Sequence, residues 1–180
     1  MTDPHDISHQ PRLDPKELTT ARYLLLRTTR TDRSPVDTPI WFAIEGDTIW
    51  FRTKTATAKV RRLRATPLVE LRVCNWKGAT KSATAFRGVA FEPEAPESAR
   101  AFELLKARYG WQWNVVPMIP IPGVRNGHQD LPWRERWRRA HQHGLWPDSS
   151  IIGIKLTATE SRQQPTAPST SSRMRSACPL

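Results

Sequence analysis

The sequence predicts a mainly β protein, in which six antiparallel strands close into a small barrel with helices beside it. Three observations lead to this fold. The expected segments run strand, strand, strand, helix, strand, strand, helix, strand, and tight polar turns join several short strands, as in antiparallel sheets. Hydrophobic residues make up 38% of the 180 residues, which allows one core. Six apolar strands lose their exposed edges most simply by closing into a barrel.

The first elements are a short helix and two strands. An Asp-Pro start, with Asp as the cap and Pro at the first helical position, predicts a helix over 14–20. A continuous apolar run predicts a strand over 22–29, and a second strand over 36–44 follows a polar turn. Pro39 has no N–H to donate, so this second strand should lie at an edge or contain a bulge.

A tight turn at 45–47 leads into the third strand and the next helix. The strand covers 48–53, and the helix covers 57–65 before a proline stops it. Val60 and Leu63 lie three residues apart, so a narrow apolar stripe of this helix should face inward.

The second half of the chain adds three strands and one long helix. Strands are expected over 68–75 and 80–91, with Gly88 as a candidate bulge. The amphipathic pattern of 96–109 predicts a helix, and the last strand covers 150–157.

One folded domain should therefore cover residues 14–157. Polar, low-complexity composition predicts that 1–13 and 158–180 are disordered. Residues 110–147 interrupt the pattern as an insert rich in Trp and Pro, and a basic helix is expected within 132–143.

The net charge of +11 points to an anionic partner. Two clusters carry much of it: Arg52, Lys54, Lys59, Arg61, Arg62 and Arg64 in one, and Arg134, Arg136, Arg138 and Arg139 in the other. Local clusters suit a small anionic ligand better than a long nucleic acid. Aromatic residues do not alternate with the cations between 54 and 64, which also argues against nucleic acid.

Several classes of protein are disfavoured. No apolar run reaches the roughly 18 residues of a membrane-spanning helix, and the polar start does not resemble a secretion signal. Cys74 and Cys178 alone make neither a disulfide scaffold nor a metal site, so a cytoplasmic location is expected. His141 and His143 are two residues apart, which disfavours a metal centre on a helix. No catalytic triad order or Gly-rich nucleotide loop is present, and no catalytic residue is identified.

The strongest local signal lies where the third strand meets the helix at 57–65. Main-chain N–H groups of the helix start, the hydroxyls of Thr53 and Thr57, and the ammonium groups of Lys54 and Lys59 would together suit a phosphate. The alternative is a solvated basic helix with no ligand.

Four stretches of sequence resemble the pyridoxamine 5'-phosphate oxidase-like superfamily of split β-barrel, FMN-binding-like proteins, and within it the actinobacterial branch of coenzyme F420-dependent oxidoreductases. They are RYLLLRTTRTDRSPVDTPIWFAIEGDTIWFRT, TATAKVRRLRATPLVELRVCNWKG, AFRGVAF and ARAFELLKARYGWQW. The resemblance implies a homodimer with the cofactor ring at the interface between subunits.

The resemblance also implies where the cofactor lies. Its phosphate would contact Arg52, Thr53, Lys54, Ala58 and Lys59. Its ring would pack along Val36, Asp37, Thr38, Pro39 and Trp41, with Trp76 contributed by the neighbouring subunit. For Trp41 and Trp76, plain core or interface packing is the alternative. Many flavin-binding members have Arg where this chain has Ala58, which is compatible with the deazaflavin branch.

The implied function is hydride transfer from reduced F420 to an unsaturated small-molecule substrate. The alternatives are an FMN-dependent oxidoreductase of the same fold, or a non-enzymatic flavin-, deazaflavin- or heme-binding protein.

The insert at 110–147 has three interpretations: it packs on the barrel and supports the dimer, it covers the cofactor and selects the substrate, or it lies on an acidic membrane surface. The last is the least favoured of the three.

Overall fold

The computed structural model describes residues 15–80, 84–112, 131–141 and 144–157. In this part of the chain the strands are β1 (Tyr23–Thr29), β2 (Pro35–Ile40), β3 (Ala43–Glu45), β4 (Thr48–Lys54), β5 (Leu68–Cys74), β6 (Phe86–Phe91) and β7 (Ser149–Thr157). The helices are α1 (Pro15–Thr20), α2 (Ala58–Ala65), α3 (Ala95–Tyr109) and α5 (Trp133–Ala140). The expected termini at 1–13 and 158–180, and much of the insert, lie outside the described residues.

The strands form one antiparallel sheet in the order β2-β1-β5-β6-β7-β4-β3. The mainly β, antiparallel fold is therefore confirmed. The prediction of six strands in a closed barrel is wrong, because the residues that the structure describes form seven strands, and the hydrogen bonding of this sheet leaves β2 and β3 as its two edges. Pro39 lies on β2, and so at an edge as expected.

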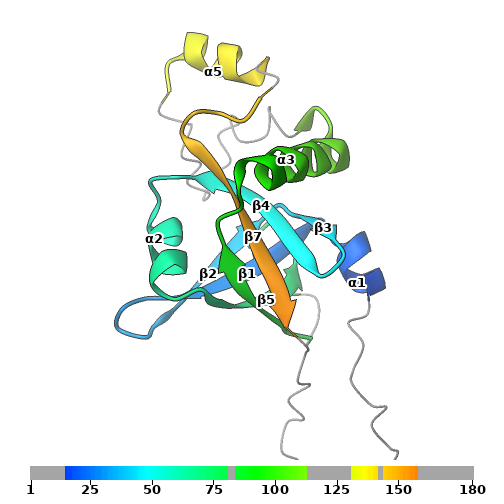
Figure 1. Cartoon of the computed structure of the whole chain (residues 1–180), viewed down its shortest axis with the longest axis vertical. Helices are drawn as coiled ribbons and strands as arrows, with labels where there is room; N and C mark the ends of the chain where they lie inside the picture. Colours follow the sequence, from blue (N-terminus) through cyan, green and yellow to red (C-terminus); the bar gives the residue numbers. More distant parts are fainter. Residues whose placement is uncertain (1–14, 81–83, 113–130, 142–143, 158–180) are drawn as a thin grey trace, which may run out of the picture.

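The extra strand arises because the predicted strand 36–44 is interrupted at Trp41 and Phe42. Ile40 still pairs with Leu24 of β1, whereas Ala43 pairs with Trp50 of β4 at the opposite edge. Two intervening residues span at most about 11 Å. Seven strands laid flat would separate the edges by about 29 Å. The sheet must therefore curl strongly, as Figure 1 shows, so that its unpaired edges approach each other.

A side chain from α3 stabilises this interruption. The backbone N–H of Phe42 donates to Oη of Tyr109 at 2.9 Å, and that hydroxyl also lies 2.9 Å from the carbonyl oxygen of Phe42. The backbone groups of Phe42 are buried, so they need such a partner once they leave the sheet. Burial raises the pKa of Tyr109, which keeps it a neutral donor.

Strand β6 differs from the prediction at both its start and its glycine. It begins at Phe86, not at residue 80, and residues 81–83 lie outside the described part. The pairing to β5 and β7 runs through Gly88 without an extra residue, so the expected bulge is wrong. Glycine is required for space: a Cβ there would come 2.6 Å from Cγ2 of Ile154.

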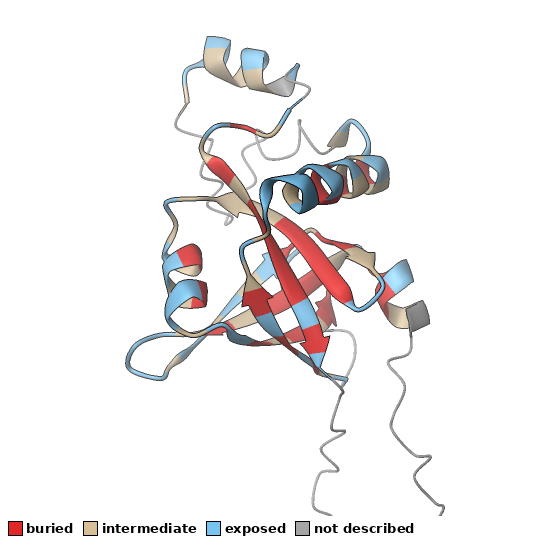
Figure 2. Cartoon of the chain, viewed as in Figure 1, coloured by how far each residue is buried: buried red, intermediate tan, exposed pale blue. Residues whose placement is uncertain are grey.

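Two apolar clusters hold the elements together. The larger lies inside the curled sheet and includes Leu24, Leu26, Phe42, Phe51 and Phe86, with α1 and α2 contributing buried leucines. The smaller one packs α3 against β3, β4 and β7 on the outside. Figure 2 shows the buried residues concentrated along these strands and on one face of α3. None of the helices in the described part is long and apolar enough to cross a membrane.

Candidate functional site

Helix α2 begins with a side-chain cap at Thr57. Its Oγ1 accepts from the N–H of Val60 at 3.3 Å and donates to the carbonyl of Lys54 at 3.0 Å. Its carbonyl accepts from the N–H of Arg61 at 3.1 Å. The Thr57 hydroxyl is therefore used by the cap, while the N–H groups of Ala58 and Lys59, the first two helical residues, take no part in it. Those N–H groups lie at the positive end of the helix dipole.

Lys59 is the cation with the most unusual surroundings. Its side chain is half-buried, and its ammonium lies 5.6 Å from the centroid of the Phe51 ring. Burial, with a smaller contribution from the charge of Arg62, lowers the pKa of Lys59 to about 8. Among the described residues, none forms an ion pair or a hydrogen bond with this ammonium. A cation in such a place gains much from an added anion.

Arg62 lies one turn further along α2 and is held by β1. Its Nε donates to Oγ1 of Thr28 at 2.9 Å, and Thr28 is fully buried. Burial and the charges of Arg30 and Arg61 lower the pKa of Arg62. The structure thus brings Arg30, from the turn after β1, into the cation cluster of α2. Sequence reasoning missed Arg30 and Thr28, since only the packing of α2 on β1 places them there.

Arg52 and Lys54 lie on the opposite face of β4 from Phe51, because strand side chains alternate. The Arg52 guanidinium lies 4.4 Å from the Trp146 ring centroid, and burial lowers its pKa to about 10. The Lys54 ammonium lies 3.9 Å from a carboxylate oxygen of Asp148. The five residues predicted to contact the phosphate therefore do not all face the same place. Lys59 lies near Phe51, whereas Arg52 and Lys54 face the segment before β7. Thr53 is half-buried and Ala58 is exposed.

The predicted ring strand β2 presents two faces. Val36 and Thr38 pair with the buried residues Thr28 and Leu26 of β1, so they point to the inside of the curled sheet. Asp37 and Pro39 are exposed on the outside. Both oxygens of Asp37 accept from Arg27 at 2.8 Å, which lowers the pKa of Asp37. Asp37 is therefore already engaged in an ion pair.

The two predicted tryptophans have different surroundings. Trp41 stacks on the ring of Tyr109, with centroids 4.5 Å apart and planes 11° from parallel. Trp76 is 48% exposed, and the ammonium of Lys77 in the same turn lies 5.0 Å from the centroid of its ring. Within this chain, Trp41 is thus a packing residue and Trp76 is a surface residue. The expected absence of a metal centre stays a prediction, since His128 and His143 lie outside the described residues.

Comparison with known proteins adds a family. Residues 16–144 match the family model described as Pyridoxamine 5'-phosphate oxidase. No curated protein is similar enough in sequence to count as a relative.

Solved structures share the fold at low identity. A conserved hypothetical protein from Mycobacterium tuberculosis is 19% identical with a TM-score of 0.51, covering 89% of this chain and 87% of its own. The heme storage protein HutZ of Vibrio cholerae is 13% identical with a TM-score of 0.50, covering 82% and 94%. A protein described as F420 reductase is 23% identical with a TM-score of 0.46, covering 79% and 92%.

Proposed function

This chain belongs to the pyridoxamine 5'-phosphate oxidase family, and from that premise we propose that it binds an anionic flavin-type cofactor, coenzyme F420, beside helix α2. The observation that carries the proposal is Lys59. Its half-buried ammonium has no acidic partner among the described residues, and its pKa is lowered to about 8. A cation in apolar surroundings loses the favourable interaction of its charge with water. A bound anion would replace that interaction and so stabilise the charged lysine.

The donor set near the start of α2 fits a phosphate. Lys59 offers an ammonium, and the first two N–H groups of the helix offer main-chain donors at the positive end of the dipole. Arg62, Arg30 and Arg61 supply further positive charge nearby. F420 carries a phosphate and a polyglutamate tail, so it is more anionic than FMN, and a cluster without an acid in α2 favours the more anionic of the two.

The chain's own residues would bind and orient the cofactor. Val36 and Thr38 face inward from β2 and would border the ring, with Trp76 as a candidate contact from a second subunit. Arg52 and Lys54 would act indirectly, because they fix the start of β7 through Trp146 and Asp148. A reduced deazaflavin supplies the hydride itself, so the protein need not provide a catalytic acid or base for that step. The proposed activity is reduction of an unsaturated organic substrate.

A titration of the full-length protein with F420, FMN and heme tests the proposal. Fluorescence reports the first two ligands and the Soret band reports heme. We expect F420 to bind more tightly than FMN. Lys59→Ala should weaken F420 binding by about 1.5–3 kcal/mol, the range of a hydrogen bond to a charged group.

Arg61→Ala is the matched control, because it removes the same charge from an exposed position in the same helix. It should cost under about 1 kcal/mol and mainly reduce the salt dependence of binding. Equal losses in the two variants would mean diffuse attraction with no phosphate site. Tighter binding of FMN or heme than of F420 would replace the proposed cofactor with one of the alternatives.

A further inference from the structure

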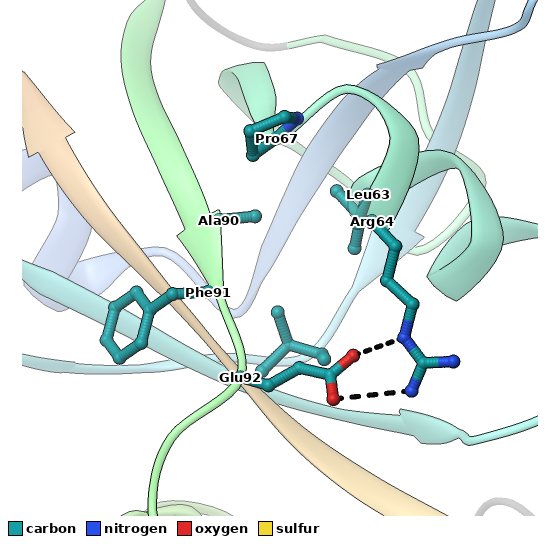
Figure 3. A pocket seen from close by; sticks show the side chains of 7 residues that line it. Leu63, Arg64, Pro67, Ala90, Phe91 and Glu92 are labelled. Carbon is teal, nitrogen blue, oxygen red and sulfur yellow. Dashed lines mark hydrogen bonds and ion pairs between the residues drawn. The ribbon is translucent and has the colours of Figure 1, made fainter.

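A cavity lies beside the C-terminal end of α2, away from Lys59. It has a volume of about 230 Å³ and is lined by Leu63, Arg64, Pro67, Ala90, Phe91, Glu92 and Ile152. Figure 3 shows it between the end of α2 and the end of β6. Arg64 follows Lys59 by five residues and so projects from a different side of the helix.

The inner wall of this cavity is apolar. Leu63, Ala90 and Ile152 are 5%, 8% and 2% exposed and belong to the core cluster inside the sheet. An apolar wall favours an apolar guest, because both surfaces are removed from water when the guest binds, and an enclosed apolar cavity of about 150 Å³ already holds benzene. The present cavity is larger than that.

Its polar lining is one ion pair. Nε of Arg64 lies 2.5 Å from Oε1 of Glu92, and Nη2 lies 3.3 Å from Oε2, as the dashed lines in Figure 3 show. Both side chains are about half exposed, at 56% and 50%. An exposed pair of this kind contributes little to stability, so it can swing aside to admit a ligand at small cost.

We propose that this cavity binds a small uncharged ring compound of about six to nine non-hydrogen atoms. The apolar wall would take the ring, and the Arg64–Glu92 pair would close over it. A charged compound is disfavoured whatever its sign, because it would lose water against the apolar wall and the Arg64–Glu92 pair, whose charges cancel, offers no net opposite charge in return. This site is separate from the proposed cofactor site and does not depend on it.

Three probes of equal ring size test the charge preference: benzyl alcohol, benzoate and benzylammonium. Saturation-transfer NMR on the full-length protein should show benzyl alcohol binding at least 10-fold more tightly than either ion. Ala90→Leu fills the cavity and should abolish binding. Ala107→Leu, the same change at an exposed position of α3, should leave binding intact. Equal binding of the three probes, or binding that survives Ala90→Leu, would overturn the proposal.

Removing the two rim charges one at a time gives a test that does not need Ala90→Leu to fold. Glu92→Gln leaves Arg64 free of its partner and should strengthen benzoate binding about 10-fold. Arg64→Gln should do the same for benzylammonium. Glu92→Gln should not strengthen benzylammonium binding, and Arg64→Gln should not strengthen benzoate binding. If either variant strengthened the binding of both ions or of neither, the proposal would be contradicted.

A competition experiment tests whether the cavity is separate from the cofactor site. Saturating F420 or FMN, and Lys59→Ala, should leave benzyl alcohol binding unchanged. Competition would instead assign the cavity to the cofactor site.

Discussion

At the residue scale, the surroundings of Lys59 explain why one lysine of a basic helix differs from its neighbours. Val60 and Leu63 are buried, so the side of α2 next to them faces the core. Lys59 lies at the border of that side, with its ammonium over Phe51. Arg61 is exposed and remains hydrated. Two cationic side chains of the same helix thus differ in their chemistry, because desolvation depends on the side of the helix.

The lowered pKa of Lys59 makes a prediction about stability. Its folded-state pKa of about 8 lies below the ordinary 10.5, so the unfolded chain binds more protons between these values and stability rises with pH there. The cost of burying the charge is fully present below pH 8. Lys59→Met should therefore stabilise the ligand-free protein by about 1–3 kcal/mol at pH 7.

Urea unfolding at several pH values measures this effect. The advantage of Lys59→Met should shrink as pH rises from about 8 to 10.5, because the wild-type lysine loses its charge in the folded state first and the cost of burying that charge disappears. Arg61→Met is the control and should show no such trend. A pH-independent difference between Lys59→Met and the wild type would mean that burial does not perturb the lysine.

At the element scale, the contact between Tyr109 and Phe42 decides how the sheet is built. The hydroxyl of Tyr109 on α3 accepts a hydrogen bond from the N–H of Phe42 and donates one to its carbonyl oxygen. The chain can therefore leave β2 and enter β3 at the other edge without unpaired backbone groups at Phe42. The ring of the same tyrosine stacks on Trp41. Helix α3 therefore does more than cover the sheet, since it also satisfies the backbone where the strand is interrupted.

Removing that hydroxyl should be costly. Tyr109→Phe keeps the ring and its stacking on Trp41 but leaves the buried N–H of Phe42 without its acceptor. We expect a loss of about 1–3 kcal/mol in the free energy of unfolding, the cost of an unsatisfied buried group. Chemical denaturation measures it. Tyr23→Phe, at a half-buried tyrosine near Trp41, is the control and should change stability by less than about 0.5 kcal/mol. Equal losses of stability in Tyr109→Phe and Tyr23→Phe would mean that the hydroxyl of Tyr109 does not stabilise the interruption.

At the scale of the whole molecule, the exposed face of β5 and β6 bears on assembly. Leu68 and Val89 pair directly across the two strands and are 66% and 37% exposed. Exposed apolar side chains grouped on a sheet face are typical of interaction surfaces. The homodimer implied by the sequence resemblance remains a proposal, and this face is where we place it.

Light scattering tests that placement. The chain of 20.6 kDa should show twice that mass in solution. Leu68→Asp, which puts a charge at the proposed contact, should shift the mass to that of one chain. Glu103→Lys is the control, because it changes an exposed residue of α3, and it should leave the dimer intact. Leu104→Asp would be unsuitable, because it would disturb packing within the chain. A monomeric wild type with cofactor bound would exclude the dimer.

The sequence by itself determined most of the helices and strands. The expected helices at 57–65 and 96–109 match α2 and α3 to within one residue, because caps and apolar spacing are local properties. The same holds for the strand at 48–53. The basic helix expected within 132–143 forms over a shorter range, Trp133–Ala140. The family also followed from the sequence, through stretches that the family model then matched.

Only the tertiary structure decided how those segments are joined and which charges meet. The interruption at Trp41 and Phe42 depends on a hydroxyl 67 residues away, and no local pattern encodes that distance. The alternation of β4 predicts that Arg52 and Phe51 project to opposite faces. The partners that meet them there, Trp146 and Lys59, come into contact only on packing. Desolvation likewise arises from neighbours distant in the chain. Local spacing fixes secondary structure, whereas burial and its effect on charge belong to the packed molecule.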